Sequence, residues 1–441
     1  MPTSTSIEIE IEKLIYGGDG LARLNGKSIF VPRVLPGERL FASVSEDRRS
    51  FSRVEPQQWI TTSATRVSPP CPYFTACGGC HYQHASYEAQ LDIKRDIFLE
   101  TLRRTGKIEL DVPVQLHASP EPWNYRNRTR LHMQHVRRFS LGYFISGTHR
   151  LLEVRECPIS SPLLNRAITT LWALGEAGHV PAFVFEVEIF ANDADEQCLV
   201  ELYVGNAGSY DYSADLTAFQ QCLLRDMPGC IGVHAFLQSA TVHSAAPIVQ
   251  HVSGEGANAI HYTVGDNTYR VSAGSFFQVN RSFVGRFVDL VTADANAGSR
   301  ALDLYAGVGL FSVPLAKRGI DVVAVESSPF SFADLETNLP AGHARCLQTT
   351  ETFLRGRSPN AQSCDLAIVD PPRAGLGAAA IALLAAAAPR TIVYVSCDPS
   401  TLARDLRSLL ESGYRIGEAH VVDMFPQTFH IESVIRLRRH E

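Results

Sequence analysis

The sequence predicts a multidomain α/β protein, and three observations support this class. Residues 7–60 alternate apolar and polar positions in short runs broken by Gly and Pro, which is typical of a small antiparallel barrel. Residues 301–328 follow the order strand, glycine turn, helix and strand, which is typical of a parallel sheet covered by helices. The 441 residues are 45% hydrophobic, enough for several cores. We therefore expect three domains, at 1–62, 63–271 and 272–441.

Composition limits the class of protein further. No stretch approaches the roughly 20 apolar residues of a transmembrane helix, and the N-terminus lacks the basic and apolar regions of a secretory signal. We therefore expect a cytoplasmic monomer with no membrane partner. Ten cysteines in that compartment argue for metal ligation or catalysis rather than disulfides. The net charge of −6 excludes a uniformly basic nucleic-acid binder but allows a local basic face.

The first domain is predicted to be an OB-like β-barrel. Its turns are marked by glycines: Gly17, Gly18, Gly20, Gly26 and Gly37. The pattern resembles a TRAM domain, an RNA-binding module, and the resemblance implies that basic side chains face RNA. The candidates are Lys13, Arg23, Lys27, Arg33 and Arg39. Because the acids of the segment offset its bases, a solvated barrel without a ligand is the alternative.

Three cysteines at the start of the central α+β domain have the spacing of a metal site. Cys71, Cys77 and Cys80 form Cys-x5-Cys-x2-Cys, and adjacent glycines let the backbone wrap closely around a bound centre. Cys157, also followed by proline, is the best candidate for a fourth ligand. Four thiolates suit either zinc or a [4Fe-4S] cluster, and spacing alone does not separate the two. Four unrelated buried thiols are a weak alternative, because clustered cysteines beside Gly-Gly are typical of metal sites.

A basic stretch with interleaved aromatic residues follows at 123–155. It holds seven arginines against one acid, Glu153. Arg126, Arg128 and Arg130 alternate along one predicted strand, so they would face the same way. Arginines beside aromatic residues suit phosphate contact and base stacking, so we expect these three to contact RNA. An edge sheet that merely carries charge is the alternative.

The third domain begins with a nucleotide-type βαβ unit. Its first strand ends at Asp303, a turn with Gly307 and Gly309 follows, and the second strand closes on Glu326. The glycines admit a ligand close to the backbone, and an acid about twenty positions on can bind ribose hydroxyls. Since no third glycine is placed for a dinucleotide pyrophosphate, the turn favours S-adenosylmethionine over NAD. A Rossmann-like domain is therefore predicted.

Cys397 is placed at the end of another predicted strand. The β-branched and aromatic residues 391–395 form the strand, and Asp398-Pro399-Ser400 breaks it before a helix. Ligands of open α/β sheets bind outside the carboxyl ends of the strands, so this thiol would face a reacting molecule. A free cysteine is also often a small buried hydrophobe, so position alone leaves both interpretations open.

Five segments together carry a family resemblance: SFFQVN, LDLYAGVG, DPPRAGL, VSCDPSTLARDL and HIESV. They resemble the S-adenosylmethionine-dependent RNA uracil-5-methyltransferases. The TRAM-like start and the four cysteines make the chain more similar to the 23S rRNA branch with a [4Fe-4S] cluster than to the bacterial tRNA enzyme. The resemblance implies that Cys397 is the nucleophile and Glu432 the general base. It also implies a cofactor pocket that includes the two turn glycines. The pocket residues are Gln278, Tyr305, Gly307, Gly309, Glu326 and Asp370. Leu310 departs from the pattern, because many members have Asn there.

The chemistry of uracil explains these residue types. A thiolate that adds to C6 makes C5 nucleophilic toward a sulfonium methyl, and a nearby carboxylate can then remove the C5 proton. The target uridine would have to be unstacked to reach the pocket. We thus predict methylation of a specific uridine, in 23S rRNA or alternatively in tRNA. There are two alternatives from other functional classes. The first is a small-molecule or protein methyltransferase with structural zinc, and the second is a non-catalytic RNA-binding adaptor. The presence of both Cys397 and Glu432 argues against the adaptor.

Overall fold

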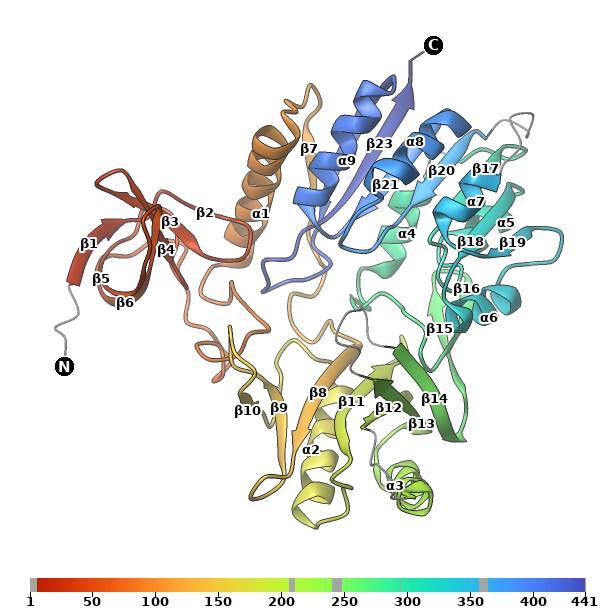
Figure 1. Cartoon of the computed structure of the whole chain (residues 1–441), viewed down its shortest axis with the longest axis horizontal. Helices are drawn as coiled ribbons and strands as arrows, with labels where there is room; N and C mark the ends of the chain where they lie inside the picture. Colours follow the sequence, from red (N-terminus) through yellow and green to blue (C-terminus); the bar gives the residue numbers. More distant parts are fainter. Residues whose placement is uncertain (1–5, 206–210, 240–247, 294, 357–363, 441) are drawn as a thin grey trace.

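The computed structural model describes residues 6–205, 211–239, 248–293, 295–356 and 364–440. Figure 1 shows a small β-barrel at one side, a central sheet with its helices, and a larger C-terminal α/β unit. The order of sheets along the chain agrees with the predicted multidomain α/β class. Among the described residues, no helix is long and apolar enough to cross a membrane.

The N-terminal barrel is a six-stranded sheet with the order β1-β5-β6-β4-β3-β2. Its strands are β1 (Ser6–Glu10), β2 (Lys13–Leu14), β3 (Gly20–Leu24), β4 (Lys27–Val31), β5 (Arg39–Asp47) and β6 (Phe51–Thr61). Asn25 and Gly26 both have positive φ, 51° and 80°, and close the β3–β4 hairpin, a turn that favours this residue pair. Gly20 lies within β3 rather than in a turn, and a Cβ there would come 2.4 Å from Val34.

The central sheet has the strand order β10-β9-β8-β11-β12-β13-β14. Its strands are β8 (Arg128–Gln134), β9 (Ser140–Phe144), β10 (Leu151–Glu153), β11 (Val184–Ala191), β12 (Cys198–Val204), β13 (Cys230–Ser239) and β14 (Ile248–Gly256). Helices α2 (Pro162–Glu176) and α3 (Ser213–Asp226) pack their apolar residues into its core. Phe190 and Leu199, in contrast, belong to the core of the C-terminal unit. The sheet is therefore joined to the C-terminal unit by apolar contacts.

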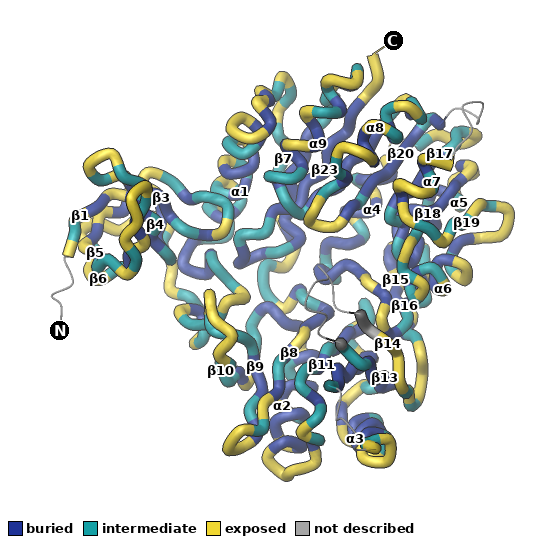
Figure 2. The backbone as a smooth tube through the Cα atoms, viewed as in Figure 1, coloured by how far each residue is buried: buried dark blue, intermediate teal, exposed yellow. Residues whose placement is uncertain are grey.

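The C-terminal sheet has the order β19-β18-β17-β20-β21-β23-β22-β7. Its strands are β17 (Arg300–Leu304), β18 (Asp321–Glu326), β19 (Ala344–Leu347), β20 (Leu366–Val369), β21 (Thr391–Ser396), β22 (Tyr414–Val422), β23 (Glu432–Arg439) and β7 (Val114–His117). β23 is antiparallel to both neighbours, while the other pairs are parallel. Helix α4 (Val284–Thr292) precedes β17, and the helices that follow strands of the sheet are α5 (Ser312–Lys317), α6 (Pro329–Asn338), α7 (Thr350–Gly356), α8 (Gly377–Ala387) and α9 (Pro399–Glu411). Figure 2 shows that the sheet's strands are largely buried, as strands covered on both faces must be.

Two segments that the sequence analysis assigns to the central domain lie in the C-terminal unit. Helix α1 (Tyr87–Thr101), continued by a short π-helix (Leu102–Gly106), leads into β7, which pairs with β22. The hairpin of β15 (Ala259–Val264) and β16 (Asn267–Ser272) packs into a core shared with α4 and β18. Long-range strand pairing, which leaves no local pattern in the sequence, decides this arrangement.

Candidate active site

The structure places Cys397 at the carboxyl end of β21, directly before helix α9. The Asp398 side chain caps this helix, because its Oδ1 accepts hydrogen bonds from the backbone N–H groups of Ser400 (2.8 Å) and Thr401 (3.1 Å). Pro399 occupies the first helical turn, which needs no N–H donor there. Cys397 is half-buried in the turn between strand and helix. Local sequence therefore fixes this thiol at the sheet edge, as predicted.

Glu432 and Asp370 lie at the same edge of the sheet. Asp370 follows β20, the parallel neighbour of β21. Glu432 is the first residue of the antiparallel strand β23, and Ser433 beside it pairs with Ser396, so the start of β23 meets the end of β21. Glu432 is only 4% exposed. One thiol and two carboxyl groups from neighbouring strands are thus brought together.

Burial and mutual repulsion shift the pKa values of these three groups upward. Burial raises the pKa of Cys397 to about 12, with the carboxylates of Glu432 and Asp370 adding to the effect and Arg373 opposing it. Burial, together with the charge of Asp303, raises the pKa of Asp370 to about 7. Burial and then Asp370 raise the pKa of Glu432 well above its usual range. The edge therefore holds proton-transfer groups that are not neutralised by ion pairing.

A small cavity beside this edge brings together four of the predicted cofactor residues. Gln278, Tyr305, Gly307 and Asp370 line it, among the apolar side chains of Phe276, Phe277, Val308, Leu310 and Phe311. A few polar groups in an otherwise apolar lining suit a ligand with aromatic and charged parts. Tyr305, a non-glycine residue, has a φ of 71°, and such strained backbone is found mostly at functional sites.

The remaining two predicted cofactor residues support the turn. The Glu326 carboxylate accepts hydrogen bonds from the backbone N–H groups of Gly307 (2.8 Å), Ser327 (2.7 Å) and Ser328 (2.6 Å). Gly309 has a φ of 93°, where a side chain would be strained. Leu310 is only 8% exposed and packs in the core beneath the cavity. An apolar side chain fits there, which accounts for the departure from Asn.

The sequence analysis did not select Asp303 as a site residue, although the structure gives it unusual properties. It is fully buried, and burial raises its pKa to about 6. Oδ2 accepts a hydrogen bond from the Ser312 hydroxyl at 2.5 Å, while within the described part of the chain Oδ1 has no hydrogen-bond partner. Its position at the end of β17, directly before the glycine turn, was the available signal.

An aromatic cluster beside Cys397 was also missed. Phe429 contacts Tyr16 edge-on (5.3 Å between ring centroids), His81 (4.6 Å) and His430 (4.3 Å). The Tyr16 hydroxyl also approaches the Asp398 carboxylate at 3.3 Å. Because these rings come from the barrel, the cysteine-rich segment and the C-terminal loop, no local pattern could reveal the cluster.

The four predicted metal ligands line one cavity of about 240 Å³, as Cys71, Cys77, Cys80 and Cys157 all border it. Nowhere in the described ranges do three or more His, Cys, Asp or Glu side chains lie close enough to hold a single metal ion. One zinc ion bound at about 2.3 Å would require sulfur atoms about 3.8 Å apart. A cubane takes one thiolate at each of four iron atoms and needs a wider set. The four thiols around a cavity thus fit a cluster better than one ion.

The predicted row of RNA-facing arginines is wrong for Arg128. This residue is 9% exposed, and its guanidinium pairs with Glu188 (2.9 Å) and Glu201 (3.2 Å). Arg130 is more exposed but pairs with Glu186 at 2.6 Å. Arg126 borders the cysteine cavity. The acids that pair with these arginines come from strands far along the sequence. The local excess of arginine therefore gave no sign of the ion pairs.

The basic residues of the barrel are likewise paired with acids. The five residues selected from the sequence form the pairs Lys13–Glu100, Arg23–Glu12, Lys27–Asp47, Arg33–Glu55 and Arg39–Glu8. Most of these side chains are substantially exposed, and exposed pairs contribute little stability. Phosphate groups can therefore compete for these cations.

Comparison with known proteins supplies the identity of the fold. Residues 347–440 match the tRNA (Uracil-5-)-methyltransferase family, and residues 4–55 match the TRAM domain. The chain is 32% identical over 438 residues to an "Uncharacterized RNA methyltransferase" of Aquifex aeolicus, covering 98% of each chain. It is 32% identical over 452 residues to the 23S rRNA (uracil(1939)-C(5))-methyltransferase RlmD of Chromohalobacter salexigens, covering 99% of this chain and 90% of that one.

A solved structure agrees over nearly the whole chain. The Pyrococcus abyssi tRNA (uracil-54, C5)-methyltransferase in complex with S-adenosyl-L-homocysteine is similar with a TM-score of 0.72 and 25% identity, covering 97% of this chain and 100% of that one. The predicted family and enzyme class are confirmed, and the adaptor alternative is excluded. The chain belongs to the RNA uracil-5-methyltransferase family, as a multidomain α/β enzyme that uses S-adenosylmethionine and carries an N-terminal TRAM domain.

Proposed function

We propose that this enzyme methylates C5 of a specific uridine in 23S rRNA, with Cys397 as nucleophile and Glu432 as general base. The observation that carries the proposal is the meeting of Cys397, Glu432 and Asp370 at one buried sheet edge beside the cavity of Gln278 and Tyr305. The 32% identity to a 23S rRNA enzyme over 99% of this chain supports the choice of RNA.

S-adenosylmethionine supplies the methyl group. Gln278, Tyr305, Gly307, Gly309, Glu326 and Asp370 hold this cofactor beside Cys397. The Cys397 thiolate adds to C6 of the uracil and thereby makes C5 nucleophilic. Once C5 carries the methyl group, Glu432 takes the C5 proton, and the electrons of that C–H bond expel the Cys397 thiolate from C6. Asp370, whose pKa is raised to about 7, is next in line as a proton acceptor.

The raised pKa of Cys397 sets a requirement for this mechanism. In the RNA-free enzyme burial, and then the carboxylates of Glu432 and Asp370, raise the pKa of Cys397 and keep this group in the thiol form. A deprotonated carboxylate among them can accept the thiol proton as the sulfur attacks. The charge of Arg373 lowers the pKa of Cys397 and therefore favours the thiolate.

We further propose that Cys71, Cys77, Cys80 and Cys157 bind a [4Fe-4S] cluster with a structural role. The proposal is supported by the position of the four thiols, which all line one cavity of about 240 Å³. Full ligation by four thiolates leaves no open position for substrate, so the cluster stabilises the segment rather than reacts. Anaerobically purified protein should be brown and hold about four iron atoms per chain. One equivalent of zinc without iron would contradict the proposal.

A tRNA uridine is the second candidate substrate. It is favoured by the similarity to the tRNA (uracil-54, C5)-methyltransferase, whose whole chain is covered. Mapping 5-methyluridine in 23S rRNA and tRNA from cells lacking the gene decides between the two. We expect loss of the modification in 23S rRNA, restored by the wild-type gene and not by Cys397→Ala. Loss confined to tRNA would select the second candidate.

A further inference from the structure

Helix α1 contributes a fully buried lysine to the C-terminal unit. Lys94 has 0% exposure, and its ammonium group donates to Asp423 Oδ1 at 2.7 Å and to the backbone oxygen of Phe425 at 3.0 Å. Asp423 is only 1% exposed. Burying both charges costs several kcal/mol per ion, so such a pair is a poor source of stability compared with apolar packing. A role other than stabilising the fold is therefore the better explanation for this buried ion pair.

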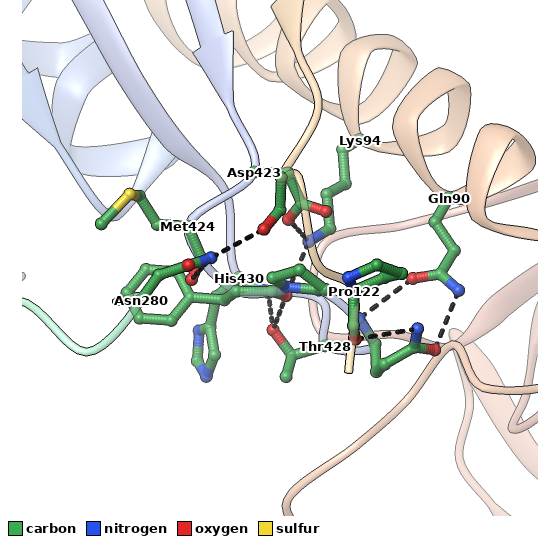
Figure 3. Close-up of polar contacts among 12 residues, drawn as sticks. Gln90, Lys94, Pro122, Asn280, Asp423, Met424, Thr428 and His430 are labelled. Carbon is green, nitrogen blue, oxygen red and sulfur yellow. Dashed lines mark hydrogen bonds and ion pairs between the residues drawn. The ribbon is translucent and has the colours of Figure 1, made fainter. Parts of the chain in front are cut away.

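Lys94 and Asp423 lie at the start of the loop that leads to the proposed base. Residues 423–431 connect β22 to β23, and Glu432 follows immediately. Val422 and Glu432 are direct cross-strand partners, so the loop begins and ends at the active-site edge. Figure 3 shows Lys94 pointing from α1 toward Asp423 and the loop backbone.

Gln90, one helical turn before Lys94, anchors the middle of the same loop. Its amide nitrogen donates to Gln427 Oε1 at 3.0 Å, and its amide oxygen accepts from the Gln427 backbone N–H at 3.0 Å. Gln427 has a φ of 70°, a backbone conformation that is strained for a non-glycine residue. Two polar side chains of α1 thus hold a strained loop from one side (Figure 3).

Other segments complete the restraint. Asn280 donates to the backbone oxygen of Met424 at 3.3 Å, and the buried Tyr125 hydroxyl donates to that of Pro426 at 3.1 Å. The backbone N–H groups of His81 and Tyr82 both donate to the backbone oxygen of Gln427, at 2.8 and 2.9 Å. Almost every residue between Asp423 and Thr428 is therefore fixed by side chains or backbone from outside the loop.

We propose that Lys94 and Gln90 are positioning residues for the removal of the C5 proton, because they hold the 423–431 loop and with it Glu432. The inference rests on the proposed role of Glu432 and extends it to a helix that precedes the central sheet in the chain. Neither side chain touches the reacting atoms. A displacement of about 1 Å at a catalytic group can cost about 100-fold in rate, so a loosened loop is enough to slow proton removal.

The inference predicts a specific defect. If Glu432 is misplaced while Cys397 stays in position, addition to C6 and methyl transfer proceed, but the C5 proton remains and the C6–S bond cannot break. Lys94→Met and Gln90→Leu should then accumulate protein crosslinked to RNA on a denaturing gel in the presence of S-adenosylmethionine. Resolution of this adduct should slow by roughly 10- to 100-fold, with cofactor affinity unchanged.

Three further variants make the test decisive. Arg95→Met removes a cation from the exposed side of the same helix and should turn over normally. Lys94→Met combined with Asp423→Asn leaves no unpaired buried charge, so it keeps the fold if Lys94→Met alone does not. Glu432→Gln is the reference, because it should give the same adduct.

Absence of adduct in the folded Lys94 and Gln90 variants, with adduct present in Glu432→Gln, would overturn the positioning role. No adduct in Glu432→Gln would instead overturn the proposed function of Glu432.

Discussion

Charged side chains in the central sheet and at the edge of the C-terminal sheet have opposite surroundings. Within the central sheet, Arg128 lies beside Glu188 and Glu201 from β11 and β12, and each carboxylate has a cation within hydrogen-bond distance. At the C-terminal edge, Asp370 and Glu432 lie beside Cys397, and burial raises the pKa of both, with the charge of Asp303 adding to the effect on Asp370 and that of Asp370 adding to the effect on Glu432. Charges inside a strand ladder meet partners on adjacent strands, whereas charges at strand ends face the crevice.

This difference explains which kind of residue is functional. A carboxylate beside a cation, such as Glu188 beside Arg128, forms an ion pair that contributes to structure, whereas burial and nearby carboxylates raise the pKa of Asp370 and Glu432 and suit them to proton transfer. Arg128 also donates to the backbone oxygen of Ser275 at 2.8 Å, close in sequence to Gln278. The central sheet thus contacts the segment that lines the cavity of Gln278, and the C-terminal edge carries the proposed catalytic groups.

The largest effect is expected when the proposed nucleophile or the proposed general base is replaced. Cys397→Ala should lower methylation by at least about 1,000-fold and give no covalent RNA complex, because the nucleophile is gone. Glu432→Gln should also block turnover but accumulate the complex. Denaturing gels with labelled RNA distinguish the two variants. Normal turnover by Glu432→Gln would show that the base lies elsewhere, with Asp370 tested first.

Removing one buried cation from the central sheet should cost stability rather than catalysis. Arg128→Met removes the guanidinium that pairs with both Glu188 and Glu201, while Arg130 stays near Glu188 and the Tyr203 hydroxyl still donates to Glu201. We expect a loss of about 3 kcal/mol in the free energy of unfolding. The matched control, Arg130→Met, involves a side chain that is 38% exposed and should cost about 1 kcal/mol or less. Urea titrations followed by fluorescence measure both. Equal losses of unfolding free energy in the two variants would contradict the stronger ion pairing of Arg128.

Removing a negative charge from the C-terminal edge should make Cys397 more reactive. The Asp370 carboxylate raises the pKa of this thiol, so Asp370→Asn should lower that pKa and increase the thiolate fraction at pH 8. We expect iodoacetamide to alkylate Cys397 several-fold faster, by roughly up to tenfold. Peptide mass spectrometry separates this residue from the other thiols. Arg373→Met should slow the alkylation of Cys397, because it removes a positive charge that lowers the pKa of this thiol. Slower alkylation in Asp370→Asn would show that the Asp370 carboxylate does not raise the pKa of Cys397.

The smallest effect is expected for RNA binding by the arginines of β8. Because Arg128 is buried in ion pairs and Arg130 is partly exposed, only Arg130→Gln should reduce the salt dependence of RNA binding, by about one unit of slope or less. Filter binding at several salt concentrations measures the slope for each variant. A larger change for folded Arg128→Gln would mean that RNA rearranges the central sheet.

The sequence by itself determined the elements whose signals are local. A strand ending followed by a helix cap placed Cys397, the Gly-x-Gly turn placed the cavity that Gly307 lines, and period-two alternation placed the barrel. These features depend on neighbours within a few residues, so a single chain displays them. The tertiary structure alone decided the pairing of Arg128, the membership of β7 in the C-terminal sheet and the burial of Lys94 against Asp423. Each of these depends on a partner more than 50 residues away. Whether a charge pairs or stays free to react is settled by such distant partners.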